Sequence, residues 1–176
     1  GTANTLYLTE QSVSENSTAT FADGAITMTS SAAKPGPNYK MTEEVVLTRE
    51  YDWSIEWKAK MSYASVLLGK DTGSANKNCI YIGLNRNGTT QTLRLDDDTG
   101  KSISFTYASS YSEAQTLYKA LNAWKLEYVS STNTMSLKLW NTSTSTWDTL
   151  ATANPTTSQF EKVTFNTLFG RYSTAN

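Results

Sequence analysis

The sequence predicts an all-β fold, a sandwich of two antiparallel sheets with at most one short helix. Apolar residues recur at every second position in several segments, turn-forming residues separate these segments, and only one stretch shows helical spacing. The 176 residues contain no repeat and no proline-rich linker, so a single domain over residues 1–176 is expected.

The clearest strand lies between Trp53 and Met61, where an apolar side chain occupies every second position. This period belongs to a strand with one buried and one exposed face, and a helix does not have it. The same reasoning predicts further strands between the turns. They are Leu6–Leu8, Thr18–Phe21, Ala25–Met28, Tyr39–Leu47, Val66–Gly69, Ile80–Leu84, Thr92–Leu95, Ile103–Tyr107, Val163–Phe165 and Leu168–Tyr172.

Two hairpins are expected from the turns that join alternating segments. Asn87-Gly88 favours the positive φ angles of a tight hairpin turn. Trp124–Tyr128 and Met135–Leu139 alternate in the same way on either side of a turn at Ser130–Asn133. Adjacent hairpins are typical of antiparallel sheets, because short turns can join only antiparallel neighbours.

Helical or irregular structure is expected in only a few places. Ser112–Leu121 is the one predicted helix, with Ser112 and Gln115 as a capping box at its start. Two prolines in Lys34–Pro37 force a loop, and the Ser/Thr run Thr142–Thr146 is expected to form another.

The composition excludes several classes of site. The absence of histidine and the single cysteine remove a Ser-His-Asp triad, a histidine-ligated zinc and an internal disulfide. The formal net charge is -1, from 15 Lys and Arg against 16 Asp and Glu. A nucleic-acid backbone or an anionic membrane therefore has little electrostatic attraction for this chain, and neither partner is expected.

The abundant serine and threonine favour strands and suit a secreted or cell-surface protein. The chain starts Gly-Thr-Ala-Asn and no stretch is apolar enough for a membrane span. A signal peptide is therefore expected to be absent or already removed. We expect an extracellular domain that belongs to a larger multidomain protein, or a processed mature chain.

Five segments form an ordered set in the second part of the sequence. They are Trp53-Ser54-Ile55-Glu56-Trp57-Lys58-Ala59-Lys60, Val66-Leu67-Leu68-Gly69-Lys70, Tyr81-Ile82-Gly83-Leu84-Asn85, the hairpin Asn122–Tyr128 with Ser136–Asn141, and Leu168-Phe169-Gly170-Arg171. In this order they resemble the concanavalin A-like jelly roll, particularly its laminin G-like branch. The resemblance covers residues 50–172 and implies a jelly-roll sandwich. Lys125-Leu126 stands where many members have histidine.

The resembled family includes lectins, carbohydrate-binding modules, hydrolases, lyases and adhesion domains, so its fold does not decide the function. Its hydrolase branch carries a Glu-x-Asp-x-x-Glu cluster, and none of the acidic residues here has that spacing. A glycosidase pair could still come from Glu56 with Glu127, or from Asp96 with Glu56, if the fold brings two carboxyl groups together. A charge-balanced strand face explains these residues equally well.

Trp140 and Trp147 are the first candidate ligand-binding residues. Trp140 has the opposite parity to Met135, Leu137 and Leu139, so its side chain is expected to face away from the core. An exposed indole can stack on the C–H face of a sugar while neighbouring polar groups bind its hydroxyls. Alternatively, the two indoles pack only against each other or the loop between them.

Further candidates have the polar parity of their strands. They are Tyr81, Arg94, Glu56 and Lys138, with Lys58 beside them. If their strands share one sheet, these side chains line a groove that suits a polysaccharide or glycan. The alternative is an ordinary charged surface.

The acidic turn Asp96-Asp97-Asp98 is the one candidate metal site, with Asp96 and Asp98 as possible Ca²⁺ ligands. Ca²⁺ prefers several carboxylate and carbonyl oxygens, and relatives of the resembled fold often hold it in such loops. The alternative is a hairpin turn in which Asp side chains cap their own backbone. No cofactor is required by either interpretation.

The leading hypothesis from the sequence is a non-catalytic carbohydrate-binding module. An adhesion or structural domain of a surface or phage tail assembly is the first alternative, because the same sandwich can bind protein. A glycoside hydrolase or lyase is the second, and it would require measurable turnover.

Overall fold

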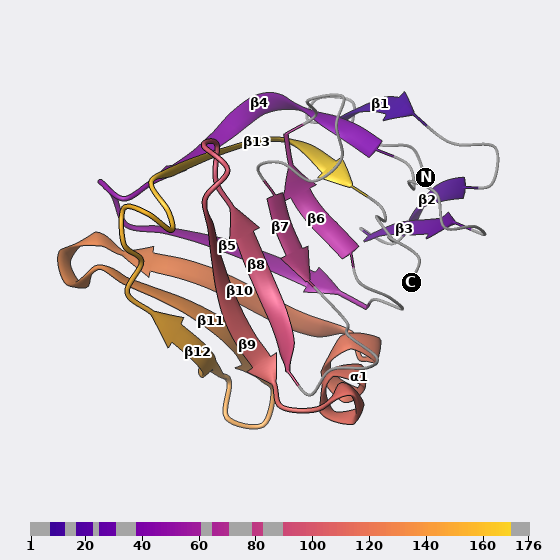
Figure 1. Ribbon diagram of the computed structural model, residues 1–176. Helices are drawn as coiled ribbons and strands as arrows, with labels where there is room; N and C mark the ends of the chain where they lie inside the picture. Colours follow the sequence, from indigo (N-terminus) through magenta and orange to yellow (C-terminus); the bar gives the residue numbers. More distant parts are fainter. Residues whose placement is uncertain are drawn as a thin grey trace.

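The computed structural model describes residues 8–12, 17–22, 25–30, 38–60, 65–70, 79–82 and 90–169. This part of the chain is almost entirely β-structure (Figure 1). Its elements are β1 (Leu8–Ser12), β2 (Ser17–Ala22), β3 (Ala25–Ser30), β4 (Asn38–Thr48), β5 (Trp53–Ala59), β6 (Ser65–Gly69), β7 (Cys79–Ile82), β8 (Gln91–Asp96), β9 (Ser102–Ala108), α1 (Tyr111–Lys119), β10 (Asn122–Val129), the single 3₁₀ turn η1 (Ser130–Thr132), β11 (Thr134–Asn141), β12 (Thr146–Ala153) and β13 (Lys162–Phe169).

The strands form two main antiparallel sheets. The larger has the order β1-β4-β13-β6-β7-β8-β9, the smaller has the order β12-β11-β10-β5, and β2 pairs only with β3. In Figure 1, β2 and β3 lie at the right of the view, apart from the four-stranded sheet. The expected all-β antiparallel architecture with one short α-helix is confirmed. None of the described helices has the length and apolar character needed to cross a bilayer.

The core lies between the two main sheets. The seven-stranded sheet contributes Leu93 and Phe105, and the four-stranded sheet contributes Trp124 and Leu137, all almost completely buried. Burying side chains of this size stabilises a fold by about 1.5–3 kcal/mol each. Trp124 stacks on Trp57 with a centroid separation of 6.4 Å. This packing fixes which face of each strand points outwards.

The hairpin formed by β10 and β11 has the predicted alignment. Trp124 pairs with Leu139 and Leu126 pairs with Leu137, so the apolar residues of both strands share the inner face. At the turn, Asn133 has a φ of 50°, a left-handed conformation that asparagine tolerates better than most residues. Its side-chain oxygen accepts hydrogen bonds from Arg49 Nη2 (3.0 Å) and Tyr128 Oη (3.1 Å).

The helix is confirmed, but the predicted cap is wrong. Ser110 is the N-cap, and its Oγ accepts a hydrogen bond of 3.1 Å from Glu113 N. The Glu113 carboxylate accepts hydrogen bonds from Ser109 N (2.8 Å) and Ser109 Oγ (2.9 Å), which lower its pKa. Gln115 instead donates to Tyr111 Oη. A serine two residues earlier, with an acidic partner, satisfies the free backbone donors.

Strand β12 was not predicted. Its apolar pattern is broken because the pairing with β11 shifts between Leu137 and Lys138: Leu137 lies opposite Ala151, whereas Lys138 lies opposite Thr149. Leu150 is therefore an extra residue, as in a β-bulge, and it packs against the core. An inserted residue reverses the parity of the side chains and hides the two-residue period from the sequence.

The remaining predicted elements differ mainly in their ends. The two segments expected near the C-terminus are one strand, β13, with an irregularity between Phe165 and Thr167. Other predictions lie wholly or partly outside the described residues. They are Leu6-Tyr7 of the first strand, the loop Lys34–Pro37, the end of the Ile80–Leu84 strand, the Asn87-Gly88 turn and the end of the last strand beyond Phe169.

Candidate functional site

The outer face of the four-stranded sheet contains a shallow groove, which we call the tryptophan groove. It encloses about 520 Å³ and is open to solvent. The groove crosses all four strands of the sheet. Its lining residues are Glu56, Trp57 and Lys58 of β5, Ala123 of β10, Trp140 of β11 and Trp147 of β12.

Trp140 and Trp147 form one end of the tryptophan groove. They are direct cross-strand partners, and their rings meet edge to face at a centroid separation of 5.3 Å. Both indoles are half-buried. Aromatic pairs prefer this geometry because the positive ring edge faces the negative ring face. The two indoles do pack against each other, and the same pair forms a wall of the groove.

The turn between these two tryptophans is held by its own side chains. Asn141 Oδ1 accepts a 3.0 Å hydrogen bond from Ser143 N, and Asn141 Nδ2 donates a 2.8 Å bond to Asp148 Oδ2. Ser145 has a left-handed backbone with a φ of 54°. A short turn held in this way keeps Trp140 and Trp147 opposite each other without a bound ligand.

A row of ion pairs lies beside the tryptophan groove. Lys125 Nζ is 3.1 Å from Glu56 Oε1 and 3.6 Å from Glu127 Oε2, and Lys138 forms an ion pair with the same Glu127. Lys125 Nζ also lies 5.5 Å from the ring centroid of Trp147. A hydrogen bond to Glu56, assisted by both carboxylate charges, raises the pKa of Lys125. The row therefore positions the Trp147 ring as well as balancing charge.

The six predicted ligand-binding residues do not share one sheet. Glu56, Trp140 and Trp147 line the tryptophan groove, and Lys138 lies two residues before Trp140 on the same strand, β11. Tyr81 and Arg94 are cross-strand partners in the seven-stranded sheet instead. Their alternating patterns place them on strands but contain no information on which sheet each strand joins.

Two important residues of this surface were not predicted. Ala123 forms the low part of the groove, and Lys125 joins Glu56 to Glu127. Both have the polar parity of β10, opposite to the buried Trp124. A short side chain at an outward position, such as Ala123, leaves a hollow in the sheet surface only if its neighbours on the adjacent strands are larger. The sequence does not show which strands are adjacent, so it gives only a weak indication of a groove.

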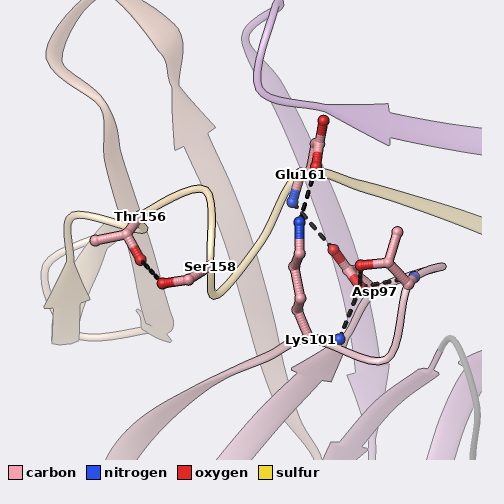
Figure 2. A network of polar contacts seen from close by, with 6 residues as sticks. Asp97, Lys101, Thr156, Ser158 and Glu161 are labelled. Atoms are coloured by element: carbon pink, nitrogen blue, oxygen red, sulfur yellow. Dashed lines mark hydrogen bonds and ion pairs between the residues drawn. The ribbon is translucent and has the colours of Figure 1, made fainter.

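The acidic turn has a different structure from the groove. Asp97 is completely buried, and its Oδ1 accepts hydrogen bonds from Thr99 N (2.8 Å), Thr99 Oγ1 (2.8 Å) and Lys101 N (2.9 Å). Its Oδ2 accepts a 3.2 Å bond from Glu161 N. Figure 2 shows these bonds, with Lys101 Nζ reaching Glu161 Oε2 at 2.8 Å.

The other two carboxylates of this turn are also bonded to protein groups. Asp96 forms an ion pair of 2.8 Å with Arg94 Nε, and Asp98 accepts 2.8 Å hydrogen bonds from both Thr164 N and Thr164 Oγ1. In the described part of the chain, no three potential metal-ligating side chains form a cluster. These contacts support a capped turn that joins β8–β9 to β13, and they leave Ca²⁺ binding by Asp96 and Asp98 without structural support.

Comparison with known proteins does not assign the chain to a family. No model of a known protein family matches the chain, and a search of curated proteins finds no relative. The interpretation of the tryptophan groove therefore depends on its geometry and chemistry.

Proposed function

We propose that this protein is a non-catalytic carbohydrate-binding domain with a concanavalin A-like jelly-roll fold. The pairing of β4 with the distant β13, and of β5 with β10, supports this topology. Each pairing joins strands that are far apart in sequence within one of the two sheets, as long connections do in jelly rolls. The described parts of the five resembling segments belong to β5, β6, β7, the β10–β11 hairpin and β13, while Gly83–Asn85 and Gly170-Arg171 lie outside the described residues.

The tryptophan groove is the observation that carries the proposal. Trp140 and Trp147 present apolar ring surface to solvent, and Glu56 and Lys58 provide polar groups at the other end of the same groove. Sugars combine flat C–H surfaces with hydroxyl groups, so an aromatic wall beside hydrogen-bonding side chains is the arrangement that binds and orients them. An open groove suits a polymer better than a small enclosed ligand.

The same surface favours binding over catalysis. Glycoside hydrolysis needs two carboxyl groups across the scissile bond, one of them able to donate a proton. Glu56 and Glu127 are instead both in ion pairs with Lys125, at 3.1 Å and 3.6 Å. A binding domain of modest affinity acts by keeping a tethered partner domain close to its glycan, which raises the effective concentration of the partner. A secreted or cell-surface protein is the setting that fits this role.

The proposal is tested by affinity electrophoresis in gels that contain polysaccharides, with and without Ca²⁺. We expect at least one polysaccharide to retard the wild type, and Trp140→Ala and Trp147→Ala to weaken retention about tenfold, which is about 1.4 kcal/mol. Tyr51→Ala is the matched control, because Tyr51 is 67% exposed and lies outside the groove. Unchanged unfolding midpoints would show that the variants still fold.

Two outcomes would contradict the proposal. If no polysaccharide retards the protein and Trp147→Ala changes the oligomer mass, the groove is a protein–protein surface and the adhesion alternative is favoured. If the wild type releases reducing sugar and Glu56→Gln abolishes that release, the protein is a glycoside hydrolase.

A further inference from the structure

The charges on the outer face of the four-stranded sheet do not cancel. Glu56 forms an ion pair with Lys125, and Glu127 forms ion pairs with both Lys125 and Lys138. These two carboxylates and two ammonium groups make a neutral row. Lys58 and Lys60 are exposed at the outward parity of β5 and its end, and neither forms an ion pair with any described residue; of the two, only Lys58 lines the groove. The two glutamates and four lysines of this face therefore carry a net charge of two positive units, whereas the whole chain carries -1.

Lys58 lies at the end of the tryptophan groove opposite the indoles. It is exposed and pairs across strands with Ala123, while Trp140 lies on β11, the next strand beyond β10. Neighbouring strands are about 4.8 Å apart, so the strands of Lys58 and Trp140 are separated by about 10 Å. A lysine side chain with four methylene groups can cover much of that distance.

Ala123 makes room for a ligand between these two groups. Its short side chain lies in the groove between Lys58 on one side and Trp140 on the other. A sugar ring seated over Ala123 would touch the Trp140 indole and extend its substituents towards the Lys58 ammonium group. A lysine with no ion-pair partner in the described part of the chain, beside an aromatic wall, favours a ligand that brings its own negative charge.

We propose that the tryptophan groove binds an acidic saccharide, with the indoles holding the ring and Lys58 binding its carboxylate or sulfate group. This inference rests on the proposed carbohydrate-binding function and adds the class of sugar. Glu56 does not repel such a ligand strongly, because Lys125 neutralises it at 3.1 Å. Of the two charged residues that line the groove, Glu56 has an ion pair and Lys58 has none among the described residues.

Two matched pairs of polymers test the inference by affinity electrophoresis and titration calorimetry. Polygalacturonate is compared with its fully methyl-esterified form, and dextran sulfate is compared with dextran. We expect the wild type to bind a charged member about tenfold more tightly than its neutral partner. Binding should weaken as salt is added, because the attraction is partly electrostatic. The two pairs also distinguish a carboxylate from a sulfate ligand.

Variants then assign the effect to Lys58. Lys58→Gln should remove the preference for the charged polymer, Lys58→Arg should keep it, and Lys162→Gln, an exposed lysine of the other sheet, should leave it unchanged. Ala123→Leu should weaken binding of every polymer by filling the groove. If neutral and charged polymers bind equally, or Lys58→Gln keeps the preference, the inference is wrong while the proposed function stands. If no polymer binds, both fail.

Discussion

The acidic turn and the tryptophan groove are both rich in charge, but their side chains have different partners. In the turn, the carboxylates of Asp97 and Asp98 accept hydrogen bonds from backbone N–H groups. On the outer sheet face, side chains pair with other side chains, and Lys58 and the indoles remain accessible. Buried carboxylates that satisfy backbone donors hold a fold together, whereas partly exposed pairs contribute little to stability and leave a surface that can bind.

The largest effect on stability is expected at Asp97. Asp97→Ala would leave backbone donors of Thr99, Lys101 and Glu161 without an acceptor in a buried site. We expect the free energy of unfolding to fall by about 3 kcal/mol, since bonds to a charged group are worth about 1.5–3 kcal/mol each. Urea denaturation measures this change.

The control for this variant is Asp148→Ala. Asp148 is exposed and accepts a hydrogen bond from Asn141, so its removal should cost about 0.5 kcal/mol. If the two variants lose equal free energy of unfolding, the buried carboxylate of the acidic turn stabilises the fold no more than an exposed one, and the contrast drawn above is wrong.

A smaller effect is expected for Lys125→Met, which keeps the buried stem and removes the charge. Lys125 is 18% exposed and pairs with two carboxylates, so we expect a loss of about 1 kcal/mol near neutral pH. Because the pKa of Lys125 is raised in the folded protein, its contribution is complete below the ordinary lysine pKa of about 10.4 and disappears as pH rises through the folded value.

Urea titrations of the wild type and Lys125→Met between about pH 8 and pH 11.5 measure this dependence. The difference between the two proteins should be constant up to about pH 10 and then shrink. A difference that stays constant up to about pH 11.5 would show that Lys125 acts through packing and not through its ion pairs.

The smallest effect on stability is expected for Lys58→Gln. Lys58 is exposed and has no ion pair among the described residues, so the free energy of unfolding should change by less than about 0.5 kcal/mol. The same variant is expected to lose the preference for acidic over neutral polymers. A large loss of stability at Lys58 would mean that it supports the sheet, and the binding result would then need a new explanation.

The sequence predicts strands well where alternation is continuous. β5 and the β10–β11 hairpin follow from it because one face of each strand is buried without interruption. β12 could not be found in this way, because the bulge at Leu150 changes parity within the strand. The helix was found from its spacing, but Ser110 and Glu113 cap it in place of Ser112 and Gln115.

The candidate site was predictable only in part. Parity placed Trp140 and Glu56 on outward faces, and cross-strand pairing then brought Trp147 beside Trp140. Which sheet a strand joins depends on pairing between segments far apart in the chain. This pairing places Tyr81 and Arg94 in the seven-stranded sheet, away from the tryptophan groove. Local capping of the turn by Asp97 was one of the two alternatives from the sequence, but the partners Glu161 and Thr164 were hidden because they lie far along the chain.

The distance along the chain between the acidic turn and its partners also affects how the protein is made. Asp97 bonds to a residue 64 positions later and Asp98 to one 66 positions later. While the chain emerges from the ribosome, the turn lacks these donors until the segment around Glu161 and Thr164 has left the exit tunnel. The nascent hairpin β8–β9 can form the bonds of Asp97 Oδ1 within its own turn, but those of Asp97 Oδ2 and Asp98 form only later, and a chain cut short before Glu161 lacks both long-range anchors of this turn.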